Sequence, residues 1–174
     1  AGKTWQHIGL PESKHIPRVR VDPRNPDIVY AAVLGNIYKP TQERGVYKST
    51  NGGKTWKKTL FANENAGAVD LIIDPNNAQV LYATTWRVNR TPYSLNSGGE
   101  GSKVWKSTDA GENWTEISTN KGFAKGTLGI MGVAVSPVQP DRVWAMVENK
   151  DQGGLYRSEN GGESRVVCKI KSYY

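Results

Sequence analysis

The sequence has 174 residues and contains a single cysteine, Cys168, which excludes an internal disulfide. It has no apolar run near the roughly 20 residues that a membrane-spanning helix needs. No stretch repeats its apolar residues with the period of a helix. Two histidines, His7 and His15, are isolated from each other and from other metal ligands. The glycines do not form a strand–turn–helix phosphate loop, so the sequence predicts no metal site and no cofactor.

Basic residues are in modest excess over acidic ones. The chain has 23 basic and 16 acidic residues, which gives a net charge of +7. The lysines are scattered along the chain, and no basic run or arginine-rich helix is visible. This distribution is typical of a solvated surface, and the sequence predicts no nucleic-acid partner.

What the sequence does contain is a repeat. The stretch Ser49–Trp56 (STNGGKTW) returns as Ser107–Trp114 (STDAGENW) and, more loosely, as residues 158–165 (SENGGESR). Residues 2–5 (GKTW) match the second half of the same stretch. Recurrence of this kind indicates one supersecondary unit that is used several times.

The residue types of the repeat favour a hairpin turn. Asn or Asp at its third position can accept hydrogen bonds from backbone groups of its own turn, and glycine at its fifth position tolerates a positive φ. Short strand-like runs precede and follow it. We therefore expect a structural role for Ser49, Asn51, Gly53, Trp56, Ser107, Asp109, Gly111, Trp114, Ser158, Asn160 and Gly162. Trp56 and Trp114 are expected to be mostly buried.

A second signature alternates with the first. Residues 21–31 match residues 73–83 and residues 135–145, each with a turn sequence between two apolar runs. Every repeat therefore reads as four short antiparallel strands. Four such strands per repeat are typical of a propeller blade.

The sequence thus predicts an all-β fold, a partial β-propeller of about three four-stranded antiparallel blades in one domain, residues 1–174. The blades are expected at about 16–61, 68–118 and 129–174, with residues 4–8 as an additional outer strand. Arg18 and Asp70 occupy the same register of neighbouring innermost strands, so we expect them to form a contact.

The repeated stretch resembles the Asp-box, or bacterial neuraminidase repeat, with the pattern Ser-x-Asp-x-Gly-x-x-Trp. The whole chain resembles the sortilin-type and glycosyl-hydrolase-like Asp-box propeller proteins of bacteria, also through residues 22–30, 43–49 and 96–99. This resemblance implies a secreted or periplasmic location and a complete ring of more blades. The chain departs from the pattern at Arg165, where a tryptophan is expected, and residues 166–174 match no other fourth strand.

About three blades do not close a ring, and an open arc exposes sheet faces and edges. Two arrangements satisfy the open ends. Either two copies form a homodimer, or the remainder of the same propeller completes the ring.

The loops on the face opposite the repeated turns are the expected ligand site. They carry guanidinium groups beside aromatic rings, which suit a carbohydrate or a carboxylate-bearing ligand. The ligand-binding candidates are Arg18, Tyr38, Arg44, Trp86, Arg87, Arg90 and Tyr93. Alternatively, these arginines pair with neighbouring acids and only hold the loops.

A glycoside hydrolase would need two carboxylates about 5–10 Å apart. The candidates for such a catalytic pair are Glu43, Glu64, Asp70 and Glu100, but their spacing in the sequence shows no convergence. The sequence therefore favours a binding or assembly module whose partner is a carbohydrate or a protein. The alternative is a sialidase-like or polysaccharide-cleaving glycoside hydrolase of the same fold.

Overall fold

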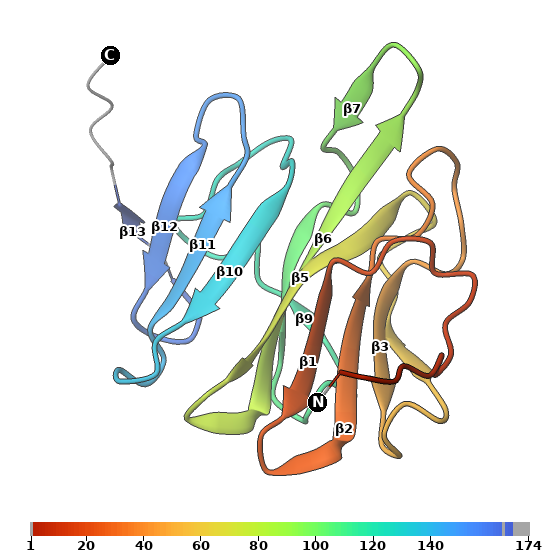
Figure 1. The fold of residues 1–174 in the computed structure, drawn as a ribbon. Coiled ribbons are helices and arrows are strands. Elements are labelled where there is room, and N and C mark those ends of the chain that lie inside the picture. The colour runs from red at the N-terminus through yellow and green to blue at the C-terminus, as the bar shows by residue number, and fades with distance from the viewer. Residues whose placement is uncertain (1, 165, 169–174) are drawn as a thin grey trace.

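The computed structural model describes residues 2–164 and 166–168, which form antiparallel sheets and, within that part of the chain, no helix. Three twisted sheets stand side by side as the blades of a partial β-propeller (Figure 1). None of the described segments is a helix that is long and apolar enough to cross a membrane.

Each sheet is one blade. Blade one consists of β1 (Arg18–Asp22), β2 (Asn25–Val33), β3 (Gly45–Ser49) and β4 (Lys57–Leu60) in that order. Blade two consists of β5 (Ala66–Asp74), β6 (Asn77–Arg90), β8 (Lys103–Ser107) and β9 (Thr115–Glu116), and β7 (Leu95–Ser97) pairs with the far end of β6. Blade three consists of β10 (Met131–Val135), β11 (Val143–Val147), β12 (Gly154–Ser158) and β13 (Val166–Cys168). Of the segment expected for this blade, residues 165 and 169–174 lie outside the described residues.

The hydrophobic core lies between the blades. Since alternate residues of a strand point to opposite faces, each blade presents an apolar face to its neighbour. One cluster joins blades one and two and includes Tyr30, Val46 and Leu71. A second cluster joins blades two and three and includes Tyr82 and Val104.

A repeated hydrogen bond fixes the two junctions. The Tyr30 hydroxyl donates to the carbonyl of Ala110 over 2.7 Å, and the Tyr82 hydroxyl donates to the carbonyl of Gly161 over 3.1 Å. Each tyrosine belongs to the second strand of its blade, and each acceptor belongs to the repeated turn of the next blade. Burial raises the pKa of Tyr30 to about 12, so this donor stays protonated.

The repeated turns, here called the box turns (residues 49–56, 107–114 and 158–164), share one hydrogen-bond pattern. In each turn the serine Oγ accepts from the N–H of the second glycine position, over 2.8 Å in Gly53 and 2.9 Å in Gly111 and Gly162. These glycines have positive φ values of 87°, 78° and 93°.

The third position of each box turn completes the pattern. Its side-chain oxygen accepts from a backbone N–H four residues further on, over 2.9 Å in each turn. The acceptors are Asn51, Asp109 and Asn160. Donation by the Asn113 backbone holds the pKa of Asp109 at about 2.

The box tryptophans Trp56 and Trp114 are partly exposed but mostly buried, as expected. The Trp114 indole N–H reaches the Thr59 hydroxyl of blade one at 3.3 Å, and that of Trp56 donates to the carbonyl of Ile8 at 3.0 Å. Trp114 therefore lies at the junction of blades one and two, whereas Trp56 lies beside the segment that precedes blade one.

Residues 4–8, expected as an outer strand, are in no strand, and the Trp5 side chain is 92% exposed. No described strand lies beside this segment to form a ladder with it, which accounts for its irregular backbone. At the other end of the arc, β13 already occupies the outer position beside β12.

The innermost strands of the three blades are joined by one carboxylate. Asp70 accepts from Arg18 Nε at 2.9 Å through one oxygen and from the Val133 backbone N–H at 3.0 Å through the other. This confirms the predicted Arg18–Asp70 contact. It also fixes the register of the three blades along the inner side of the arc.

Candidate ligand-binding site

The loops that lie opposite the box turns rest on a small core of their own. Leu34, Val69 and Val88 are buried together, and Ile37 and Trp86 pack against them. This core connects the loop of blade one with the long hairpin of blade two. It gives the loop face a fixed base, which is a requirement for a preorganised binding site.

The β6–β7 hairpin projects from this base (Figure 1). The Arg90 backbone N–H donates to the carbonyl of Ile37 at 2.8 Å, so the hairpin and the loop that contains Tyr38 lie side by side. Tyr93, in the turn of the hairpin, is 98% exposed, and Tyr38 is 63% exposed. Arg90 is exposed too. Three of the expected ligand-binding residues are therefore exposed on the loop face, Arg90 next to the loop of Tyr38 and Tyr93 at the projecting turn of the hairpin.

Trp86 and Arg87 support this hairpin from its base. The Trp86 indole N–H donates to the Ser97 hydroxyl at 2.9 Å, and that hydroxyl donates to Glu148 of blade three at 2.6 Å. The guanidinium of Arg87 donates to the carbonyl of Gly98 at 3.3 Å. Both side chains are half-buried and hold the hairpin against blade three.

Arg44, also expected to bind ligand, is a structural residue instead, because it is only 1% exposed. Its guanidinium donates to the carbonyls of Asn65 at 2.9 Å, Asn36 at 2.5 Å and Lys39 at 3.4 Å. Burial lowers the pKa of Arg44, since no carboxylate compensates for the lost hydration. The side chain fills the space between the loop of blade one and the entry loop of blade two.

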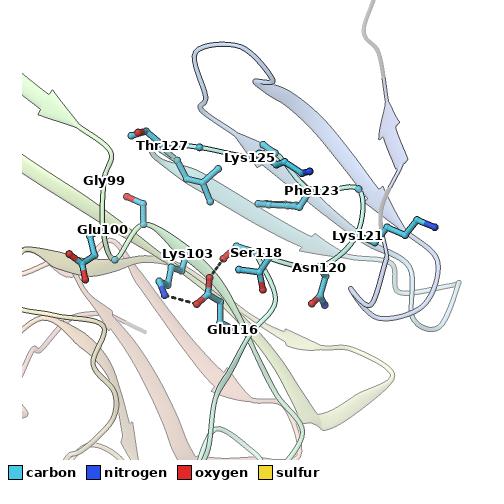
Figure 2. A pocket seen from close by; sticks show the side chains of 17 residues that line it. Gly99, Glu100, Lys103, Glu116, Ser118, Asn120, Lys121, Phe123, Lys125 and Thr127 are labelled. Carbon is cyan, nitrogen blue, oxygen red and sulfur yellow. Dashed lines mark hydrogen bonds and ion pairs between the residues drawn. The ribbon is translucent and has the colours of Figure 1, made fainter.

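The corresponding place between blades two and three is open. A cavity of about 890 Å³ lies there between residues 99–103 and the loop 118–128 (Figure 2). Ser102 stands where blade one has Arg44, since each lies five residues before the serine of its box turn. A serine side chain cannot reach the next blade, and the Ser102 hydroxyl accepts from the Arg87 backbone N–H at 2.9 Å instead.

One wall of the cavity carries a hydrogen-bonded group of side chains (Figure 2). The Lys103 ammonium contacts Glu116 at 2.5 Å, and the Ser118 hydroxyl donates to the other Glu116 oxygen at 2.8 Å. The opposite wall is the loop that includes Asn120, Phe123 and Lys125. Lys103 and Glu116 are half-buried, so both face the cavity as well as each other.

The four carboxylates considered for catalysis are placed apart. Asp70 is bound to Arg18 at the innermost strands, and Glu64 is exposed in the entry loop of blade two. Glu43 lines a smaller cavity of about 410 Å³ beside blade one. Glu100 lines the large cavity, where Glu116 is the second carboxylate.

Sequence reasoning missed most of the cavity residues, namely Ser102, Lys103, Glu116, Ser118, Asn120, Phe123 and Lys125. Two signals point to them in retrospect. The entry loop of blade three is longer than that of blade two, and the arginine at position 44 has no counterpart in blade two. Within the described residues, no group of three or more metal-ligating side chains is assembled.

Three blades with box turns on one face and long loops on the other define a β-propeller module. The family model described as sortilin, neurotensin receptor 3 (Sortilin-Vps10) matches residues 44–173. The chain belongs to this family.

Known relatives agree with the fold. The xyloglucanase Xgh74A of Acetivibrio thermocellus is 25% identical to this chain over an alignment of 192 residues. The alignment covers 92% of this chain and 21% of the relative. The chain therefore spans about a fifth of the length of that relative.

Solved structures show the same architecture. The structure of an ancestral GH74 enzyme is similar, with a TM-score of 0.71 and 19% sequence identity. The similarity covers 98% of this chain and 20% of the chain of that enzyme. YCF48 from Cyanidioschyzon merolae is similar with a TM-score of 0.59 and 16% identity, over 97% of this chain and 44% of that one.

Proposed function

We propose that this chain is a glycan-binding propeller module whose ligand contacts the loop face, and that its box turns are Asp-boxes with a structural role. The observation that carries the proposal is the exposure of the Tyr93 and Tyr38 rings on a hairpin and a loop that are joined by the Arg90–Ile37 backbone hydrogen bond above a packed base. Exposed aromatic rings with a neighbouring guanidinium offer stacking surfaces and hydrogen-bond donors to a sugar. The similarity to a xyloglucanase supports a polysaccharide as ligand.

A glycan array followed by calorimetric titration of the best ligand tests this function. Tyr93→Ala and Tyr38→Ala are expected to weaken binding about tenfold or more each, because stacking of one ring contributes about 1–3 kcal/mol in comparable sites. Trp5→Ala is the matched control, since this ring is exposed on another part of the molecule. Equal losses in all three variants, or none in the tyrosine variants, would contradict the proposal.

A protein ligand is the second possibility for the same surface. A structurally similar protein, YCF48, has been solved bound to D1 peptide. Protein binding would appear as an empty glycan array together with capture of a specific protein that the Tyr93→Ala variant no longer captures.

A glycoside hydrolase remains the alternative, and one observation favours it. Glu100 and Glu116 line the same cavity, as a pair of carboxylates would in a hydrolase. A panel of chromogenic glycosides tests it, with Glu116→Gln as the variant. Release of chromophore by the unmodified chain and its loss in Glu116→Gln would establish catalysis.

The open flanks favour assembly. Met146 on blade three is 66% exposed, and Val19 and Val21 of β1 are exposed on blade one. These apolar side chains would be covered by a second copy or by further blades of the same propeller, in a secreted or periplasmic protein. Light scattering tests self-association, and a monomer at micromolar concentration would exclude the homodimer.

A further inference from the structure

The cavity between blades two and three has a positively charged wall. Lys125 lies on the loop 118–128, which contains no acidic residue, and Lys121 lies on the same loop with its side chain pointing away from the cavity (Figure 2). No described group pairs with either ammonium, whereas the Lys103 ammonium is paired with Glu116. The loop wall therefore attracts anionic groups, and the net charge of +7 of the chain adds to this attraction.

The remainder of the cavity is polar and can both donate and accept hydrogen bonds. Glu100, its one carboxylate outside the ion pairs of the described residues, lies on the side of the cavity across from the loop wall. Ser118 is buried at its edge, and Asn120 provides an amide. The Lys103–Glu116 pair presents a donor beside an acceptor, which matches two neighbouring hydroxyl groups of one sugar ring.

The floor adds an apolar contact and a rigid support. Phe123 is buried and packs against Tyr156 with a ring separation of 5.1 Å. The cavity volume of about 890 Å³ lies within the range of about 300–1,000 Å³ that is usual for ligand sites.

From this geometry we infer that the cavity binds a segment of an acidic oligosaccharide. Its carboxylate lies at Lys125, and its hydroxyls contact Asn120 and the Lys103–Glu116 pair. The inference rests on the proposed glycan-binding function and adds to it a second contact region and the charge class of the ligand.

The test is calorimetric titration of the whole chain with three probes at low ionic strength. The probes are trigalacturonate, cellotriose as a neutral sugar of the same length, and hexaglutamate as an acidic peptide. We expect trigalacturonate to bind at least tenfold more tightly than cellotriose, with an affinity that falls as salt is added. Equal affinity for both sugars, or tighter binding of hexaglutamate, would overturn the inference.

Charge reversal locates the site. Lys125→Glu is expected to weaken trigalacturonate binding about fivefold, the size expected for reversal of one exposed charge near the ligand. Lys54→Glu makes the same change in the box turn of blade one, on the opposite face, and is expected to leave the affinity unchanged. Equal effects of the two variants would show that only the overall charge matters, and the inference would fail.

Filling the cavity provides a second test that does not depend on lost charge. Ser102→Arg introduces the side chain that closes the equivalent place between blades one and two. We expect loss of trigalacturonate binding although the variant carries more positive charge, in a protein whose melting temperature shows that it is folded. Unchanged binding in this variant would refute the site.

The results also separate this inference from the proposed function. If cellotriose binds, and Tyr93→Ala abolishes this binding while Ser102→Arg does not, the hairpin surface is a glycan site and the cavity is not. If trigalacturonate binding is lost in Ser102→Arg and retained in Tyr93→Ala, the cavity binds the acidic sugar and the hairpin does not contribute. If neither sugar binds but the glycan array yields a ligand whose binding depends on Tyr93, the inference fails and the proposed function stands; if the array is empty as well, both fail.

Discussion

The junction between blades one and two differs from the junction between blades two and three at the loop face. At the first junction, Arg44 extends into the next blade and donates to the carbonyl of Asn65. At the second junction, Ser102 occupies the corresponding position, and a cavity of about 890 Å³ remains. The residue at this position, together with the longer entry loop of blade three, thus distinguishes the open junction from the closed one.

The difference is confined to the loop end of the blades. At the strand level both junctions have a buried apolar cluster and a tyrosine that donates to the following box turn. The scaffold therefore stays constant while its loops vary, which is how binding sites commonly arise on repeat folds.

The largest effect is expected from opening the closed junction. Arg44→Ala should lower the free energy of unfolding by about 3 kcal/mol, because it leaves a void and three carbonyls without their donor. Ser102→Ala is the matched change at the open junction and should cost less than about 1 kcal/mol. Urea denaturation measures both, and equal losses would show that the two junctions do not differ in this way.

The box tryptophans offer the next comparison. Trp114→Ala should cost about 2 kcal/mol, because its mostly buried ring lies between blades one and two. Trp56 lies against its own box turn and the irregular segment around Ile8, and not between two blades, so Trp56→Ala should cost less. Thermal melts of both variants test this order, and a larger loss for Trp56→Ala would contradict it.

The ion pairs at the closed junction should have a smaller effect that depends on pH. Glu112 contacts Lys48 at 2.7 Å and Lys57 at 2.8 Å, and these ammonium groups lower its pKa. A lowered folded-state pKa stabilises the fold above the unfolded value of about 4.3, and this contribution is lost as the pH falls through the folded value.

Glu112→Gln should therefore reduce stability near neutral pH by about 1 kcal/mol. Solvent screens the pair of Glu112 (40% exposed) with Lys57 (70% exposed), whereas Lys48 is only 8% exposed and loses its carboxylate partner. The difference between the variant and the unmodified chain should vanish in acid. Unfolding curves at several pH values measure this, and a difference that persists below the folded pKa would exclude the ionic explanation.

The smallest effect on stability is expected at the third position of the box turns. Asp109 has a folded pKa of about 2, whereas Asn51 and Asn160 occupy the same position in the other two turns and do not titrate. Asp109 therefore stabilises the fold above about pH 4 and loses this contribution between about pH 4 and 2. Asp109→Asn should flatten the acid-induced fall of the melting temperature in this interval, and an identical pH profile would contradict this role.

The blade architecture could be predicted from the sequence, because local turn chemistry and strand alternation determine it. The Arg18–Asp70 contact followed from the register of two repeats and is confirmed. The burial of Arg44 could not be predicted, since its partners are carbonyls of loops whose course depends on the packing between blades.

The cavity was missed for a related reason. Its walls come from residues 99–103 and 118–128, and only the packing of blade three against blade two brings them together. Loop length indicated where such a site can form, but not which side chains face it.

The central claim is that the open junction, and not the closed one, contacts an acidic sugar. A map of backbone amide chemical shifts of the isotope-labelled chain, recorded with saturating trigalacturonate, tests it most directly. The account predicts that the largest changes fall in residues 99–103 and 118–128, with none in residues 36–43. Changes concentrated in residues 36–43, or spread over lysines on both faces, would contradict it.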